Sequence, residues 1–226
     1  LGLTGIPAVA EIIMVERDLR LVEMTGGRLH FSNISTGEAV RAIGAAKARG
    51  FDITCDTAPP YFALNEASVG EYRTFAKLSP PLRSEADRLA VVQGLADGTI
   101  DCIASDHAPH DEDSKRLPFG EAAFGGVGLE TLLPVSLELY HNGHMKLLDL
   151  IAKLTSGPAD VMRLGAGQLA KGAPADLSLF DPDQGWQVDA DELASKAKNS
   201  PFDGRPVQGV VRRTVIDGRT VFVRGA

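Results

Sequence analysis

The segment 105–110, SDHAPH, holds the side chains best suited to chemistry in this chain: one carboxylate and two imidazoles. It follows the apolar run 100–104, IDCIA, which predicts a buried strand. In an α/β sheet, catalytic groups lie at the carboxyl ends of strands. Asp106 could therefore ligate a cation and accept a proton from a metal-bound water, and His110 could meet a substrate carboxylate. These residues alone leave open a helix N-cap Asp followed by loop histidines.

Sequence blocks along the whole chain resemble one known family. The blocks, with SDHAPH and the residues that follow it taken as one, are LGLTGIPA (1–8), SPPLR (79–83), SDHAPH with PFGEAAFGGVGLET (118–131), GAPADLSLFD (172–181) and SKAKNSPFDG (195–204). In this order they resemble the class I dihydroorotases of the amidohydrolase superfamily. Each block is weakly specific by itself, whereas five blocks in the family's order are specific.

The resemblance implies an α/β fold class. It implies the C-terminal part of a TIM (β/α)8 barrel of the metal-dependent hydrolase type, residues 1–165, with part of a small β-sandwich domain, residues 166–226. A whole TIM barrel takes about 250 residues, so we expect three barrel strands at most. We also expect this chain to pack against the N-terminal part of the barrel, which the given sequence does not contain.

The resemblance also implies roles for individual residues. Asp106 corresponds to a carboxylate that is both a zinc ligand and the general base or acid. His110 corresponds to a residue that binds the substrate carboxylate. Phe124 and Gly125 match a segment whose main chain contacts the dihydropyrimidine ring. Ser79 stands where the family commonly has Asn, and its hydroxyl can still donate one hydrogen bond, so substrate contact there remains open.

Zinc is the cofactor that the family implies, yet most of its ligands are absent from this sequence. The family's H-x-H pair does not occur, and no H-x-E-[ND] block precedes the segment that begins at residue 28. Asn33, in the block RLHFSNIST at 28–36, occupies a position that is His in the family, and an amide is a much poorer zinc ligand than imidazole. His30 is three residues away, which turns it to the other face of a strand, so we predict a structural role for it. We therefore expect weak or absent zinc binding by this chain alone.

Two functions follow from the resemblance. The first is a zinc-dependent dihydroorotase that interconverts N-carbamoyl-L-aspartate and L-dihydroorotate in pyrimidine biosynthesis, here as an incomplete chain. The second is a non-catalytic dihydroorotase-like protein that scaffolds aspartate transcarbamoylase. Asn33 favours the second, whereas Asp106, His110 and the Phe124–Gly125 loop favour the first. Another cyclic amidohydrolase, such as a dihydropyrimidinase or allantoinase, is disfavoured by the SPPLR and APH blocks.

Composition narrows the classes of partner. The net charge is −7 and Arg212–Arg213 is the one basic cluster, which argues against nucleic acid. No apolar run approaches the 18 residues of a membrane span. Cys55 and Cys102 fall in predicted strands as buried, reduced thiols, which suits a cytoplasmic protein. The expected partners are the small-molecule substrate and a possible homodimer.

Periodicity and capping residues predict how the chain is organised. A βα alternation is expected first and short antiparallel strands afterwards. The expected helices are 8–24, 38–49, 84–97, 129–141 and 147–164, and the expected strands are 29–34, 51–57, 100–105, 176–180, 209–216 and 220–223.

Overall fold

Three parallel strands form the sheet that carries the predicted site. A computed structural model describes residues 2–3 and 5–225. The strands are β1 (Leu29–Phe31), β2 (Ile53–Thr57) and β3 (Cys102–Ile103), in the order β1-β2-β3. Both pairs are parallel. The three strands and their parallel pairing confirm the predicted βα organisation.

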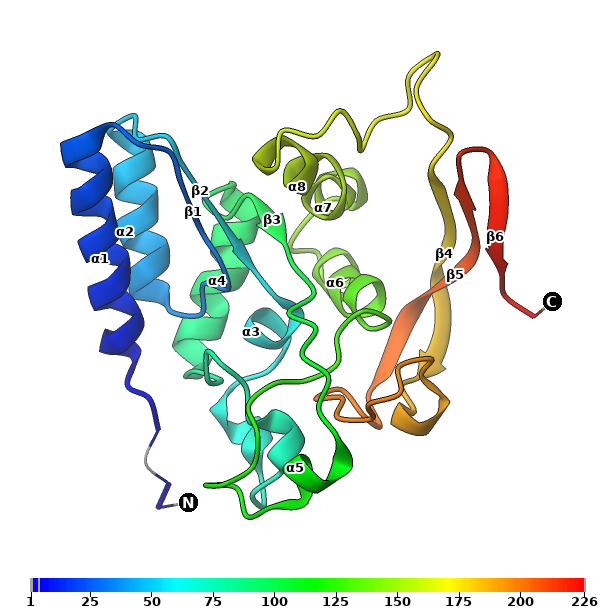
Figure 1. Ribbon diagram of the computed structural model, residues 1–226, viewed down its shortest axis with the longest axis horizontal. Helices are drawn as coiled ribbons and strands as arrows, with labels where there is room; N and C mark the ends of the chain where they lie inside the picture. The colour runs from blue at the N-terminus through cyan, green and yellow to red at the C-terminus, as the bar shows by residue number, and fades with distance from the viewer. Residues whose placement is uncertain (1, 4, 226) are drawn as a thin grey trace.

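Three helices connect and flank these strands. They are α1 (Ala8–Thr25), α2 (Gly37–Ala48) and α4 (Glu85–Asp97), and α2 packs against both of the others. The side chains of Thr36 and Ser84 accept hydrogen bonds from the first turns of α2 and α4, and both helices start within one residue of the predicted positions 38 and 84. Figure 1 shows α1 and α2 together on one side of the sheet.

The predicted helix 147–164 is two helices in the structure. They are α7 (Leu147–Leu154) and α8 (Ser156–Val161), separated at Thr155. A continuous helix would bring the ring of Pro158 against the carbonyl of Leu154, which explains the break. Together with α6 (Leu132–His141), they lie between the parallel sheet and the C-terminal strands (Figure 1).

A second, antiparallel sheet contains the last strands of the chain. These are β4 (Leu177–Gln187), β5 (Pro206–Ile216) and β6 (Arg219–Val223), in the order β4-β5-β6. The first two are longer than the sequence predicts, because β-bulges interrupt the pairing of β4 without ending it. The division at 165/166 remains a prediction. No helix in the described part of the chain is long and apolar enough to cross a membrane.

Three elements near the carboxyl ends of the parallel strands differ from expectation. The Pro59–Pro60 pair, which follows the predicted strand 51–57, begins the helix α3 (Pro59–Ala63), because proline fits the first turn of a helix. Residues 65–72, for which neither a helix nor a strand is predicted, contain the short 3-10 helix Glu66–Val69. The strand predicted over 100–105 pairs at only two residues.

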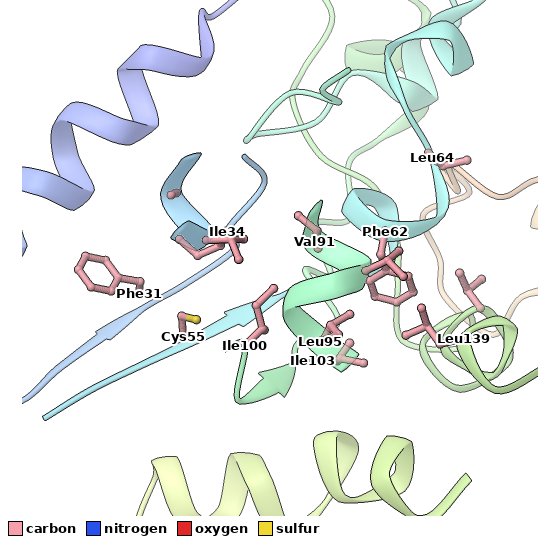
Figure 2. Close-up of a cluster of buried hydrophobic side chains, with 14 of the residues drawn as sticks. Phe31, Ile34, Cys55, Phe62, Leu64, Val91, Leu95, Ile100, Ile103 and Leu139 are labelled. Atoms are coloured by element: carbon pink, nitrogen blue, oxygen red, sulfur yellow. The ribbon is translucent and has the colours of Figure 1, made fainter. Parts of the chain in front are cut away.

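The core lies between the parallel sheet and its helices. Apolar side chains from β1, β2, β3, α3, α4 and α6 meet in one buried cluster (Figure 2). Cys55 and Cys102 are free and buried, as the sequence predicts. Members labelled in Figure 2 include Phe31, Cys55, Phe62, Val91, Leu95, Ile103 and Leu139. This packing fixes the strand ends from which the candidate site is built.

Candidate functional site

Two side chains meet where strands β1 and β3 end. Asn33 lies two residues after β1 with φ 57°, and Asp106 lies three residues after β3 with φ 48°. Asn and Asp tolerate this left-handed conformation better than other non-glycine residues do. The Asn33 amide Nδ2 donates to Asp106 Oδ1 at 3.2 Å. Asn33, which the resemblance assigns to a His position of the family, is therefore in direct contact with the predicted catalytic carboxylate.

Tyr61, on α3, is a site residue that the sequence reasoning missed. Its hydroxyl lies 3.0 Å from Asp106 Oδ2 and 3.1 Å from the carbonyl oxygen of Pro80, and its one proton serves both acceptors. Burial, and then the nearby Asp106, raise the pKa of Tyr61 well above its ordinary value, so the phenol stays protonated. The PPYF stretch at the end of β2 was the available signal.

Both oxygens of Asp106 thus accept a hydrogen bond from within the chain. Burial raises the pKa of the Asp106 carboxyl, while the bonds from Tyr61 and Asn33 act in the opposite direction. Asp56, one strand away, adds to the rise. A half-buried carboxyl with a raised pKa is suited to taking up and releasing a proton.

Asp56, near the end of β2, organises the neighbouring strand end. Its carboxylate accepts from the backbone N–H of Asn33 at 2.6 Å and from the Ser32 hydroxyl at 2.9 Å. It also lies 2.9 Å from His30 Nε2, and the other ring nitrogen of His30 lies 2.8 Å from the Thr54 hydroxyl. Both nitrogens of His30 are therefore engaged, as expected of a structural histidine.

His110 lies in the loop that follows Asp106. Its backbone N–H donates to Asn199 Oδ1 at 3.3 Å. His110 lines a cavity of about 230 Å³ with Lys115 and Asn199, among others. Asp106 lines a different cavity, of about 10 Å³, between Pro59–Pro60 and Pro201–Phe202. The described residues therefore do not bring His110 and Asp106 into one cavity.

Gly125 packs tightly against the His110 loop. A Cβ at this glycine, which has φ 126°, would lie 2.6 Å from Ala108 Cβ and 3.1 Å from His110 Nε2. Its N–H donates to the Lys77 carbonyl at 2.9 Å. Its carbonyl accepts from Lys115 Nζ at 2.9 Å and from Asn199 Nδ2 at 3.1 Å. The main-chain groups of Gly125 are thus engaged within the protein, and substrate contact there remains a prediction.

Phe124 and Ser79 are accessible. Phe124 is 47% exposed, and the Lys77 ammonium lies 4.4 Å from its ring centroid. Ser79 is exposed and precedes Pro80 through a cis peptide bond. Ser79 is therefore adjacent to the carbonyl that meets the Tyr61 hydroxyl. Arg83, in the same SPPLR block, is buried and donates to Ser35 Oγ and the Ile6 carbonyl, so it anchors this loop to the segments around residues 6 and 35.

The site can also be tested for its fit to a metal ion. Across residues 2–3 and 5–225, no group of three or more His, Cys, Asp or Glu side chains is placed to hold one. Catalytic zinc takes three protein ligands, whereas at the end of β3 the carboxylate of Asp106 has an amide, Asn33, beside it. The residues of this chain alone therefore do not fit a catalytic zinc.

Three parallel strands with flanking helices, and a carboxylate just beyond the carboxyl end of β3, are features of part of a (β/α)8 barrel. The model of the amidohydrolase family matches residues 20–221. The chain belongs to the amidohydrolase family. The predicted fold class, part of a TIM barrel of this family with part of a small β domain, is confirmed by this match and by the solved structures described next.

Curated relatives and solved structures agree with this family. The chain is 53% identical to a dihydroorotase of Anaplasma phagocytophilum (strain HZ) and 50% identical to one of Wolbachia sp. subsp. Drosophila simulans (strain wRi), covering 98% of this chain and 50% and 51% of those proteins. It superposes on the L-hydantoinase (dihydropyrimidinase) of Arthrobacter aurescens with a TM-score of 0.91 and 31% identity, over 97% of this chain and 50% of that one. The chain spans about half the length of the curated relatives it matches.

Proposed function

We propose that this chain is part of a dihydroorotase, which hydrolyses the cyclic amide of L-dihydroorotate to N-carbamoyl-L-aspartate and closes it again. The observation that carries the proposal is about 50% identity, over nearly the whole chain, to proteins named dihydroorotase. The position of Asp106 after β3 supports it, because the carboxyl ends of barrel strands hold catalytic groups. Such an enzyme would serve pyrimidine biosynthesis in the cytoplasm.

Asp106 is the group we assign to proton transfer. In ring opening, the oxygen of water bonds to the amide carbon, the C–N bond breaks, and the nitrogen gains a proton. Asp106 would take the proton from the attacking water and deliver it to the leaving nitrogen. Tyr61 and Asn33 hold the two carboxylate oxygens and so fix the direction of the free lone pairs.

Substrate contacts are assigned to the loops around this carboxylate. His110 would pair with the substrate carboxylate, and Ser79, Phe124 and Gly125 would border the ring. Exposure of Ser79 and Phe124 supports their share of this assignment. Zinc, the cofactor expected of the family, would need ligands from outside these 226 residues, and Asp106 is the ligand that this chain would contribute.

A second function is favoured by Asn33. The amide occupies a family ligand position and bonds to Asp106, while its Oδ1 is buried with no hydrogen-bond partner among the described residues. A site of this kind is compatible with a non-catalytic homologue that scaffolds aspartate transcarbamoylase. The intact Asp106–Tyr61 pair favours the enzyme over this alternative.

Turnover of paired substrates tests the proposal. The open reading frame that contains this chain is expressed in full, and the purified protein is assayed with L-dihydroorotate and, as control, with hydantoin. We expect L-dihydroorotate to be opened and hydantoin to be opened at least tenfold more slowly. Preference for hydantoin would assign another cyclic amidase. No turnover, with stoichiometric co-sedimentation of aspartate transcarbamoylase, would assign the scaffold.

A further inference from the structure

Lys115 is a buried cation without an acidic partner. It lies on the short helix α5 (Glu112–Arg116), and the residue is 2% exposed. No Asp or Glu side chain among the described residues lies within 4.0 Å of its ammonium. Burial, and then the nearby Lys77 ammonium, lower the pKa of Lys115 to about 8. A buried charge costs free energy unless it is well hydrogen-bonded, so its backbone contacts must stabilise it.

The Lys115 ammonium joins three backbone segments. It donates to the carbonyls of Ala123 at 2.8 Å, Gly125 at 2.9 Å and Lys77 at 3.4 Å. An ammonium has three protons and no acceptor, so these carbonyls take its full donor capacity. Two of the three acceptors flank Phe124, the exposed residue assigned to the substrate ring.

Asn199 joins the same loop from the small-domain side. This amide is 2% exposed, and its Nδ2 donates to the carbonyls of Ala108 and Gly125, both at 3.1 Å. Its Oδ1 accepts from the backbone N–H of His110. The carbonyl of Gly125 therefore accepts hydrogen bonds from both Lys115 and Asn199. Through Asn199, the Gly125 carbonyl is linked to the loop that holds His110.

Lys77 holds the Phe124 ring in turn. Its ammonium lies 4.4 Å from the Phe124 ring centroid and donates to the Gly120 carbonyl at 2.9 Å. The Thr74 hydroxyl, on the adjoining 3-10 helix, donates to the backbone carbonyl of Lys115 at 2.6 Å. The loop from His110 to Phe124 is thus fastened along its length to the 74–77 segment.

We propose that Lys115, together with Asn199, is a positioning residue that holds His110 and Phe124 in the geometry required to bind substrate. Neither residue has been assigned a contact with the substrate, and both act through backbone carbonyls. The inference rests on the proposed function for the identity of the substrate. The ordering of the loop by Lys115 and Asn199 can be measured without any substrate. Loosening the loop should weaken substrate binding more than it slows the reaction.

The test compares three substitutions in the full open reading frame. Lys115→Met keeps an unbranched side chain that is one heavy atom shorter and removes the cation. Lys115→Arg keeps a donor-rich cation. The matched control is Arg116→Met, which removes an exposed cation on the same helix that pairs with Glu112 at 2.5 Å. Each variant is characterised by kcat and KM for L-dihydroorotate and by amide hydrogen exchange of residues 104–112 and 118–126.

We expect Lys115→Met to raise KM about tenfold with a smaller change in kcat, which corresponds to about 1.4 kcal/mol. Amide hydrogen exchange of residues 104–112 and 118–126 should be faster in Lys115→Met than in the wild type. Lys115→Arg should show smaller changes in both KM and exchange, and Arg116→Met should match the wild type. Unchanged KM and exchange in Lys115→Met would overturn the proposal. If the wild type has no turnover, the proposed function fails, and hydrogen exchange alone decides the positioning role.

Asn199→Asp covers the case in which Lys115→Met does not fold. It removes the donors to Ala108 and Gly125 and keeps an acceptor for the His110 N–H. We expect the same pattern of raised KM and faster exchange. Wild-type KM and wild-type hydrogen exchange in a folded Asn199→Asp protein would contradict the proposal that Asn199 helps Lys115 to position the loop through the Gly125 carbonyl.

Discussion

Gly128 offers a direct test of how closely the segment 118–131 packs on the residues that follow β3, where Asp106 lies. A Cβ at Gly128 would lie 2.2 Å from the carbonyl oxygen of Ser105. The two backbones would have to separate by about 0.8 Å to reach the 3.0 Å that a Cβ needs. Because Ser105 immediately precedes Asp106, the displacement would move the carboxylate.

Gly128→Ala should therefore lower both stability and activity. Over-packing of this size costs about 1–3 kcal/mol, and a displacement of about 1 Å at a catalytic group can cost about 10²-fold in rate. The free energy of unfolding is measured by urea denaturation, and kcat/KM is measured with L-dihydroorotate, in the full open reading frame.

Gly120→Ala is the matched control for Gly128→Ala. A Cβ at Gly120 meets nothing within 4 Å and the glycine is not in a left-handed conformation. We expect it to be neutral or to stabilise the protein by up to about 1 kcal/mol. Wild-type stability and kcat/KM in Gly128→Ala would refute the close packing of this loop on the Asp106 strand.

Two further predictions concern the stability and packing of the fold. Glu11→Ala should destabilise the protein by about 3–5 kcal/mol in urea denaturation, because it leaves the buried Arg83 guanidinium, 3.7 Å away, without its carboxylate and removes the acceptor of four hydrogen bonds from Ser35 and Thr36. Exposed Glu16→Ala is the control, and an equal small effect of both substitutions would contradict the prediction. Burial raises the pKa of Cys55 and Cys102 to about 12. At pH 8, iodoacetamide should therefore label these thiols about 10³-fold more slowly than free cysteine until the protein unfolds. Rapid labelling of the native protein would refute their burial.

Local signals in the sequence were enough to predict several elements. The expected helices 38–49 and 84–97 match α2 and α4 within one residue at each end, because helix periodicity and capping depend on neighbours only a few residues away. The structural role of His30 followed from the period of a strand, which the bonds to Thr54 and Asp56 fit. These inferences needed no knowledge of tertiary contacts.

Contacts between distant residues could not be predicted in this way. Tyr61 meets Asp106 across 45 positions and Asn33 meets it across 73, and neither separation leaves a local pattern. The donors that Lys115 and Asn199 direct at one carbonyl depend likewise on how the loops fold back. The sequence therefore indicated the chemistry of Asp106 without indicating which residues hold it.

The most direct test of the central claim is the effect of Asp106→Asn on L-dihydroorotate turnover by the full open reading frame. Asn has the size of Asp but cannot accept a proton at neutral pH. The account predicts a wild type that opens the ring and an Asp106→Asn variant with kcat/KM lower by about 10²–10⁴-fold, at an unchanged melting temperature. A folded Asp106→Asn variant with the wild-type rate would contradict the assignment of proton transfer to this carboxylate, as would a wild type without turnover.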